Sequence, residues 1–240
     1  MRVMAGVLHA GGRMARASVF IIAATVWLAG CGEGIGPPPS SAVQDPMLHH
    51  LRWSPDLGSP TFAALRGGTG FGGFESPSES ALRILDTYQT SFWARRGSDT
   101  AVEIRYRAAD GTWQPYIRLT VPGDALDRRP DGSRFAAGDS VLITLALDSA
   151  QLVVQLEPTG LVFKEGSRAR LDVWYTGADP DLDGSGTVNE ADLYVEQTLL
   201  AVWVQERPGT PWSAVVSVHS LDNKLFTAGL RHFSGYAVSH

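Results

Sequence analysis

Side chains that carry oxygen recur at every second position of one short segment, D-P-D-L-D-G-S-G-T-V-N-E-A-D-L, which spans residues 179–193. Such a set suits a hard cation, because Ca²⁺ takes about six to eight oxygen ligands in a flexible shell. The four carboxylates of Asp179, Asp181, Asp183 and Asp192 would repel one another without a cation. The segment therefore predicts a calcium site, and the alternative is an ordinary solvated acidic turn.

Two registers of a calcium loop fit this segment. In such a loop, oxygen ligands stand at positions 1, 3, 5, 7, 9 and 12, and glycine stands at position 6. In one register the ligands are Asp181, Asp183, Ser185, Thr187, Asn189 and Asp192. In the other register they are Asp179, Asp181, Asp183, Ser185, Thr187 and Glu190. The first register is favoured, because it places the apolar Val188 at position 8, where the second places Gly186.

The favoured register resembles the dockerin-type loop, D-x-[DN]-x-[DNS]-G-x-φ-x-x-x-D-L. Dockerins use two such loops and this segment offers one, so cohesin binding is not implied. A short helix is expected directly after the loop. Asn189 can cap this helix, and Glu190 and Asp192 suit the positive end of its dipole.

The first thirty residues are typical of a secretory signal peptide, because two arginines precede an uncharged apolar run over residues 17–30. This run is shorter than the roughly 20 residues that a membrane span needs. It ends in Leu28-Ala29-Gly30-Cys31, which resembles the bacterial lipobox, L-[AS]-[GA]-C. The resemblance implies that Cys31 is acylated and becomes the N-terminus. Since glycine rather than aspartate follows Cys31, it also implies the outer membrane of a bacterial cell envelope.

Composition excludes several classes of protein. The chain has 240 residues, is 44% hydrophobic and carries a formal charge of −5. Such an apolar content can build a core, and an acidic balance argues against binding of nucleic acid. A single cysteine excludes an internal disulfide and any metal site built from several cysteines.

The sequence divides into a signal peptide over 1–30, a tether over 31–59 and a β-rich domain over 60–240. The tether is rich in proline, glycine and serine, which favour an extended or flexible chain. It contains His49 and His50, which are interpreted as solvated rather than metal-bound. Residues 68–73 match G-x-G-x-x-G, but Pro77 opposes the helix that a dinucleotide site needs, so a flexible glycine loop is expected.

Short runs with alternating apolar residues fill the chain from Phe92 onward, and turn residues separate them. They lie at 102–106, 116–121, 141–147, 152–156, 161–163, 171–175, 200–205, 212–218, 225–230 and 233–238. This pattern predicts a mainly β fold, an antiparallel β-sandwich, with one short helix after the calcium-type loop. Tryptophans in or beside these runs are expected in the core: Trp93, Trp113, Trp174, Trp203 and Trp212.

Three segments together resemble the ZU-five domain, a β-sandwich of ankyrins, netrin receptors and tight-junction scaffolds. They are Gln155–Phe163, Pro208–Trp212 and Gly229–Val238, which resemble the family's φ-x-P-x-G-φ-x-F, G-x-W and HFS-x-Y segments. The resemblance covers residues 91–240 and implies a binding or scaffolding module without naming a ligand. The chain departs from the family by an insertion at 177–198, which contains the calcium-type loop.

No G-x-S-x-G, H-E-x-x-H or P-loop motif occurs in the sequence. His232, in the closing segment, is interpreted as a structural histidine rather than a catalytic one. We therefore expect a non-catalytic envelope lipoprotein that binds calcium and a protein or glycan partner. The alternatives are a hydrolase that uses acidic residues and a purely structural surface module.

Overall fold

The computed structural model describes residues 48–67 and 81–240. The described residues all belong to one compact unit, Gln44–His240. Cys31, the expected signal peptide and the glycine segment 68–73 lie outside the described residues. Within the described part, no helix is both long and apolar enough to span a bilayer.

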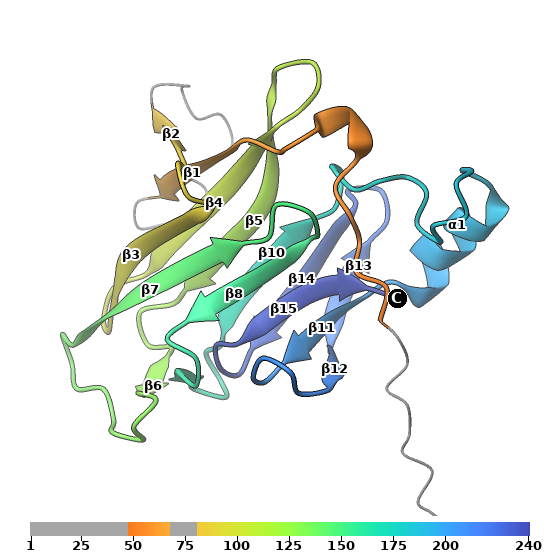
Figure 1. Ribbon diagram of the computed structural model, residues 1–240. Helices are drawn as coiled ribbons and strands as arrows, with labels where there is room; N and C mark the ends of the chain where they lie inside the picture. Colours follow the sequence, from red (N-terminus) through yellow and green to blue (C-terminus); the bar gives the residue numbers. More distant parts are fainter. Residues whose placement is uncertain (1–47, 68–80) are drawn as a thin grey trace, which may run out of the picture. The chain divides into compact units, whose positions relative to one another are not determined.

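The described chain is mainly β, as the sequence predicts, and its strands pair antiparallel in two large sheets (Figure 1). The seven-stranded sheet has the order β13-β14-β10-β5-β4-β1-β2, and the six-stranded sheet has the order β12-β11-β15-β8-β7-β3. The strands of the first sheet are β13 (Ser217–Ser220), β14 (Leu225–Leu230), β10 (Ala169–Trp174), β5 (Trp113–Val121), β4 (Thr100–Arg107), β1 (Phe62–Gly67) and β2 (Arg83–Ile84). Those of the second are β12 (Trp212–Val215), β11 (Ala201–Gln205), β15 (Gly235–Ser239), β8 (Val153–Glu157), β7 (Ser140–Leu147) and β3 (Gln89–Arg95).

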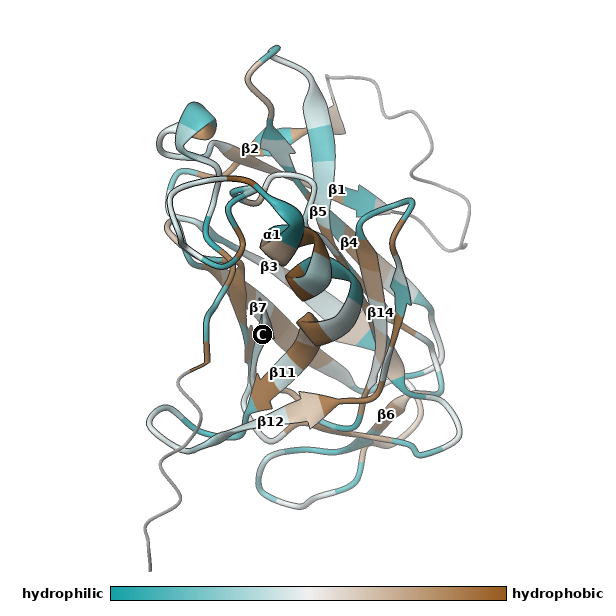
Figure 2. Ribbon diagram, turned by 90° about the vertical axis from the view of Figure 1, so that its right-hand side faces the viewer, coloured by the Kyte–Doolittle hydropathy of each residue, from teal (hydrophilic) through white to brown (hydrophobic). Residues whose placement is uncertain are grey.

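Short elements complete the fold. β6 (Leu126–Arg128) and β9 (Val162–Phe163) form a separate two-stranded pair. A 3₁₀ turn, η1, spans Pro55–Leu57, and the expected helix, α1, spans Glu190–Tyr194 and continues as a π-turn, η3, over Val195–Leu199. The helical segment lies in front of the sandwich, between β11 and β14 (Figure 2).

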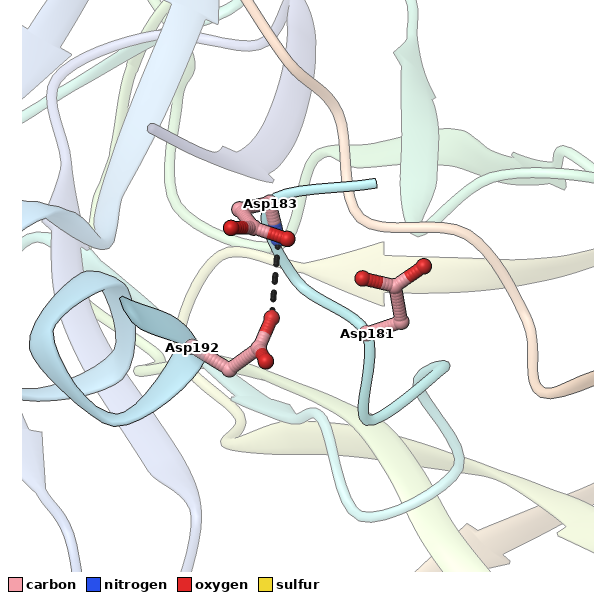
Figure 3. Close-up of side chains that lie close together, drawn as sticks. All are labelled: Asp181, Asp183 and Asp192. Atoms are coloured by element: carbon pink, nitrogen blue, oxygen red, sulfur yellow. Dashed lines mark hydrogen bonds between the residues drawn. The ribbon is translucent and has the colours of Figure 1, made fainter. Parts of the chain in front are cut away.

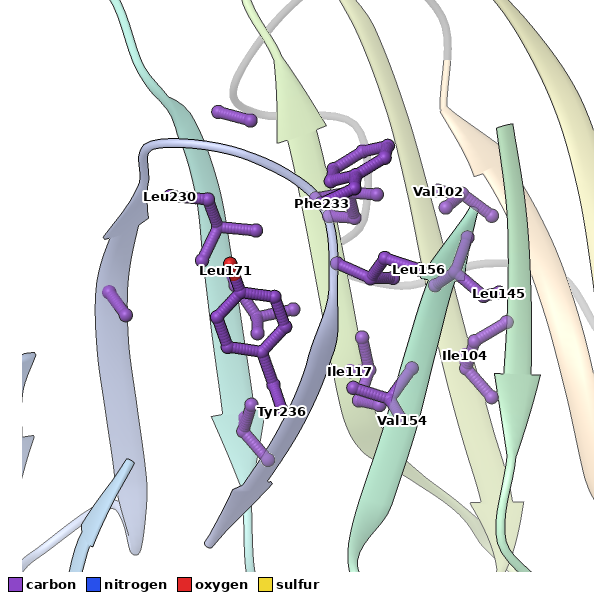
Figure 4. Close-up of a cluster of buried hydrophobic side chains, with 14 of the residues drawn as sticks. Val102, Ile104, Ile117, Leu145, Val154, Leu156, Leu171, Leu230, Phe233 and Tyr236 are labelled. Carbon is purple, nitrogen blue, oxygen red and sulfur yellow. The ribbon is translucent and has the colours of Figure 1, made fainter. Parts of the chain in front are cut away.

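The core lies between the two sheets, because alternate side chains of each strand point inward. Ile104 and Ile117 of the seven-stranded sheet are fully buried, as are Leu145 and Leu156 of the six-stranded sheet (Figure 4). Burial of each such side chain contributes about 1.5–3 kcal/mol relative to exposure. The alternation that predicted the strands therefore also defines the core.

One run that the sequence suggests as a single strand, residues 212–218, forms two strands in different sheets. β12 pairs with β11 of the six-stranded sheet, and β13 pairs with β14 of the seven-stranded sheet. Val216 lies between them and is 95% exposed. The adjacent Val215 and Val216 break the alternation, and the chain changes sheets at this point.

The part of the expected tether that the structure describes is packed against the sandwich. In this strap, residues 48–54, isolated bridges pair His50 with Ser239 and Trp53 with Ala178. Leu51 and Trp53 are buried, and the Trp53 ring packs against Phe62, Tyr106 and Tyr116. The domain boundary suggested at residue 59 is therefore too late, because the β-sandwich includes residues from 48 onward.

The expectation that five tryptophans lie in the core is wrong. Trp93 is 65% exposed, and the other four are half-buried: Trp113, Trp174, Trp203 and Trp212. Trp93, Trp174 and Trp203 lie on strand positions whose neighbours in the chain are buried, so their own side chains point outward. Trp53, in the strap, is the tryptophan that the described core contains.

Candidate metal centre

The calcium-type loop follows β10 and is held by three other segments. The backbone N–H of Asp179 donates to the Arg52 carbonyl of the strap at 2.9 Å. Nε2 of His240, the last residue, lies 2.9 Å from the Leu182 carbonyl oxygen, which accepts from it. The loop therefore joins the strap, the C-terminal residue and the helical segment.

Three carboxylates of the loop lie together (Figure 3). One oxygen from each of Asp181, Asp183 and Asp192 can be chosen so that all three lie within 4.8 Å of one another. At this separation three negative charges repel one another, and a cation between them would remove the repulsion. Ca²⁺ prefers carboxylate oxygens, so the group is able to hold it.

Backbone hydrogen bonds shape the loop around these carboxylates. The Gly186 N–H donates to Asp181 Oδ2 at 2.8 Å, and the Ser185 N–H donates to Asp183 Oδ1 at 2.9 Å. Gly184 and Gly186 have φ values of 71° and 86°, a left-handed conformation that glycine adopts without steric cost. The two glycines thus allow the chain to turn tightly enough for its carboxylates to converge.

Asp192 has two structural roles in addition to its place in the group. Asn189 caps α1 by accepting a hydrogen bond from the Ala191 N–H at 2.8 Å, and the Asn189 N–H donates back to Asp192 Oδ2 at 2.7 Å. The Asp183 N–H donates to Asp192 Oδ1 at 3.1 Å. These backbone donors lower the pKa of the buried Asp192 carboxyl, so it stays ionised and able to bind a cation.

The three grouped carboxylates all belong to the register that starts at Asp181. Asp179, the first residue of the other register, instead accepts a hydrogen bond from the Asp181 N–H at 3.1 Å. Glu190, its last residue, is exposed on the first turn of α1 and is not a member of the group. The group therefore includes every carboxylate of the set Asp181, Asp183, Ser185, Thr187, Asn189 and Asp192, but only two of the four carboxylates of the other set.

The three histidines singled out in the sequence lie apart from the grouped carboxylates. His50 Nδ1 lies 2.6 Å from Ser239 Oγ, and the His49 ring stacks on the His240 ring. His232 Nε2 lies 3.2 Å from a carboxylate oxygen of Glu206. None of these rings is a member of the metal-competent group among the described residues.

A cavity of about 520 Å³, not anticipated from the sequence, lies beside the loop. Its lining includes the apolar side chains of Val188 and Leu193 and the polar groups of Tyr175 and Glu196. The Tyr175 hydroxyl lies 2.8 Å from His219 Nε2, and burial raises the pKa of that hydroxyl. Tyr175 and Glu196 lie on separate segments of the chain, so no local motif predicts the cavity.

No family model, curated protein or solved structure matches the chain. What the protein does therefore has to be argued from its own residues.

Proposed function

We propose that the protein is a lipid-anchored component of a bacterial cell envelope, and that its β-sandwich is a non-catalytic binding or scaffolding module that uses calcium. The calcium part depends on one observation, the convergence of the carboxylates of Asp181, Asp183 and Asp192. The anchor part depends on the lipobox-like Leu28–Cys31 segment, with the chain's one cysteine at the position to be acylated.

Calcium fits this loop better than other common cations. All candidate ligands offer oxygen, which disfavours zinc, copper and other metals that prefer nitrogen or sulfur. Magnesium demands near-ideal octahedral geometry and gives up its waters reluctantly. A site of this kind in an extracytoplasmic module needs only weak affinity, with a Kd of roughly 10⁻⁴–10⁻³ M.

The place of the loop suggests what the cation does. The loop bonds to the strap through Asp179 and Arg52 and to the C-terminal residue through Leu182 and His240. In our proposal, bound calcium holds these contacts in place and so fastens the end of the tether to the sandwich. The cation then has a structural role, and the binding surface lies elsewhere on the module.

Thermal unfolding with calcium and with a chelator tests the calcium part. The chain from Cys31, with Cys31→Ser, retains the strap that truncation at residue 59 would remove. At a calcium concentration of about 100 Kd we expect about 2.7 kcal/mol of stabilisation, or a rise in Tm of about 5–10 °C. Asp183→Asn should abolish this rise, and Asp222→Asn, at an exposed turn outside the loop, should keep it. Absence of a calcium-dependent rise, or an equal rise in Asp183→Asn, would contradict the proposal.

Metabolic labelling with a fatty acid tests the anchor part. We expect the wild-type chain to incorporate the label and to fractionate with membranes, and Cys31→Ser to do neither. Two acyl chains are enough for stable anchoring. An unlabelled wild-type chain would refute the anchor and would leave the calcium result unaffected.

A further inference from the structure

One residue from each of six neighbouring strands forms a continuous row across the outer face of the seven-stranded sheet. In order from β1 to β13, the paired residues are Leu65, Glu103, Arg118, Asp172, Thr227 and Val218. Ile104, Ile117 and Leu171, which neighbour the charged members along the chain, lie in the core. Successive side chains of a strand point to opposite faces, so the charged row points away from the core.

Arginines cover the two carboxylates of this row. Glu103 accepts from Arg105 Nε at 2.6 Å and from Arg118 Nη2 at 2.5 Å. Asp172 accepts from Arg170 Nη2 at 2.7 Å. The Glu103 and Asp172 side chains are 0% and 1% exposed, whereas those of Arg105, Arg118 and Arg170 are 15%, 22% and 45% exposed. The two carboxylates therefore lie beneath the guanidinium groups, and of these three arginines Arg170 is the most exposed to solvent.

A gain in the stability of the fold is a weak explanation for these buried ion pairs. Removing two carboxylates from water costs free energy that the ion pairs only partly offset, and apolar replacements are often as stable. What the pairs do provide is orientation, because a guanidinium bound through two nitrogens is held in one plane. Arg118 uses both Nε and Nη2 on Glu103, and Arg170 does the same on Asp172.

The face has the opposite charge to the rest of the chain. Its outward charged side chains on β4, β5 and β10 are Glu103, Arg105, Arg107, Arg118, Arg170 and Asp172. Four arginines and two carboxylates give this arginine face a net charge of +2, whereas the whole chain carries −5. A positive surface on an acidic protein is complementary to an anionic partner and would turn toward it.

Two half-buried tryptophans lie on the same face. The guanidinium of Arg118 lies 5.4 Å from the ring centroid of Trp174, and that of Arg107 lies 6.0 Å from that of Trp113. Indole rings and long cationic side chains together are typical of the headgroup region of a bilayer, because each combines an apolar body with a polar end. A cluster of about four or more arginines or lysines beside a membrane is also typical of binding to anionic lipid.

The length of the tether permits this contact. Sixteen residues separate Cys31 from Leu48, where the described strap begins. Fully extended they span about 55 Å, and as a flexible coil they average about 20–25 Å. A chain anchored at Cys31 would thus keep the sandwich within reach of the bilayer at all times.

We propose that the arginine face docks on the anionic phospholipid headgroups of the bilayer to which the chain is tethered. This inference rests on the anchor at Cys31 in the proposed function, because a net charge of +2 gives only weak binding. The tether makes the contact intramolecular and raises the effective concentration of headgroups to roughly millimolar, so weak binding suffices. Docking would orient the sandwich and leave the six-stranded sheet free for a partner.

The single cysteine allows a test that does not depend on biological acylation. The chain from Cys31 is coupled through this thiol to a maleimide lipid in vesicles that also contain a brominated lipid, which quenches tryptophan fluorescence on contact. The vesicles consist of phosphatidylcholine alone or of phosphatidylcholine with phosphatidylglycerol. We expect quenching to be several-fold stronger with phosphatidylglycerol, to disappear in about 1 M salt, and to weaken in Trp113→Phe and Trp174→Phe.

Charge variants at exposed positions locate the contact. Arg107→Glu, on the arginine face, should remove the effect of phosphatidylglycerol, and Arg207→Glu, the same charge change beyond β11, should preserve it. Should Arg107→Glu unfold the chain, Arg107→Gln replaces it, and the unfolding temperature of each variant is measured first. Equal quenching on both kinds of vesicle, or equal loss in Arg107→Glu and Arg207→Glu, would overturn the proposal. Because the coupling is chemical, these results stand apart from the labelling test of the natural anchor.

Discussion

A side-chain Cβ atom at Gly177 would lie 2.8 Å from Cζ3 of Trp53. Gly177 follows β10 and Trp53 belongs to the strap, so these two segments can pack this closely only because Gly177 has no side chain. The same Cβ would lie 2.9 Å from Cζ of Tyr106. Both rings are buried and packed, and neither can move aside as the end of a flexible side chain could.

Gly177→Ala should therefore lower the free energy of unfolding by about 1–3 kcal/mol, the usual cost of overpacking a core. Gly166→Ala is the matched control, because a Cβ there meets nothing within 4 Å and the position is exposed. Denaturant unfolding of the two variants beside the wild type measures the difference. Equal stability of Gly177→Ala and Gly166→Ala would show that the strap does not pack closely against this glycine in solution.

The strap shows why the sequence predicts the strands better than the domain boundary. Alternation at 102–106 extends over several residues and predicts β4 from the local sequence. In the strap, only Leu51 and Trp53 are apolar at alternate positions, and proline lies on either side. Its partners are remote, and His50 bonds to a residue 189 positions away. Such pairing depends on tertiary contacts, and a single sequence gives no local sign of it.

Substitution of Trp53 tests the strap directly. Trp53 is 6% exposed and packs on the rings of Phe62 and Tyr116, so Trp53→Ala should cost about 3–5 kcal/mol. Trp93→Ala is the control, because Trp93 is 65% exposed and should change stability little. If the segment were a tether in solution, Trp53→Ala would be as stable as the wild type in equilibrium unfolding.

The candidate metal site, like the fold, could be predicted from the sequence only in part. The spacing of Asp179, Asp181 and Asp183 is local, so the sequence predicts an oxygen-rich loop. Which acids complete the group depends on how α1 folds back, and this brings Asp192 rather than Glu190 toward Asp181. The register that starts at Asp179 offers four carboxylates and the one that starts at Asp181 offers three, so a count of carboxylates does not identify the group that the backbone brings together.

Asp192→Asn and Glu190→Gln distinguish the two registers. Asp192→Asn removes the charge that accepts from the Asn189 and Asp183 N–H groups, so it should cost about 1 kcal/mol even without calcium. It should also abolish the calcium-dependent rise in Tm. Glu190→Gln, at an exposed position, should keep the full rise. The reverse outcome, measured by calcium titration of the two variants, would favour the register that starts at Asp179.

The pH dependence of stability reports on two half-buried histidines. Burial lowers the pKa of His50 and His219 and outweighs the opposing effects of the nearby Asp148 and Glu196 carboxylates. In the unfolded chain each imidazole has a pKa of about 6.5. Below this value the unfolded chain binds protons that the folded chain resists, so the free energy of unfolding should fall from about pH 7 to about pH 5. Carboxylates with lowered pKa values, such as Asp192, lose their contribution only at lower pH, near and below about pH 4.

His219→Phe separates the contribution of one of these rings. The His219 ring stacks on Phe226 with centroids 4.0 Å apart, and a phenyl ring can keep that stacking while it removes the titrating group. The variant loses the hydrogen bond to Tyr175 at every pH, so its stability should be lower at about pH 7. Its stability should nevertheless fall less steeply than that of the wild type as the pH approaches about 5, because one fewer proton is taken up on unfolding. Urea midpoints at several pH values measure both slopes, and parallel slopes would mean that His219 titrates in the folded protein as it does in the unfolded chain.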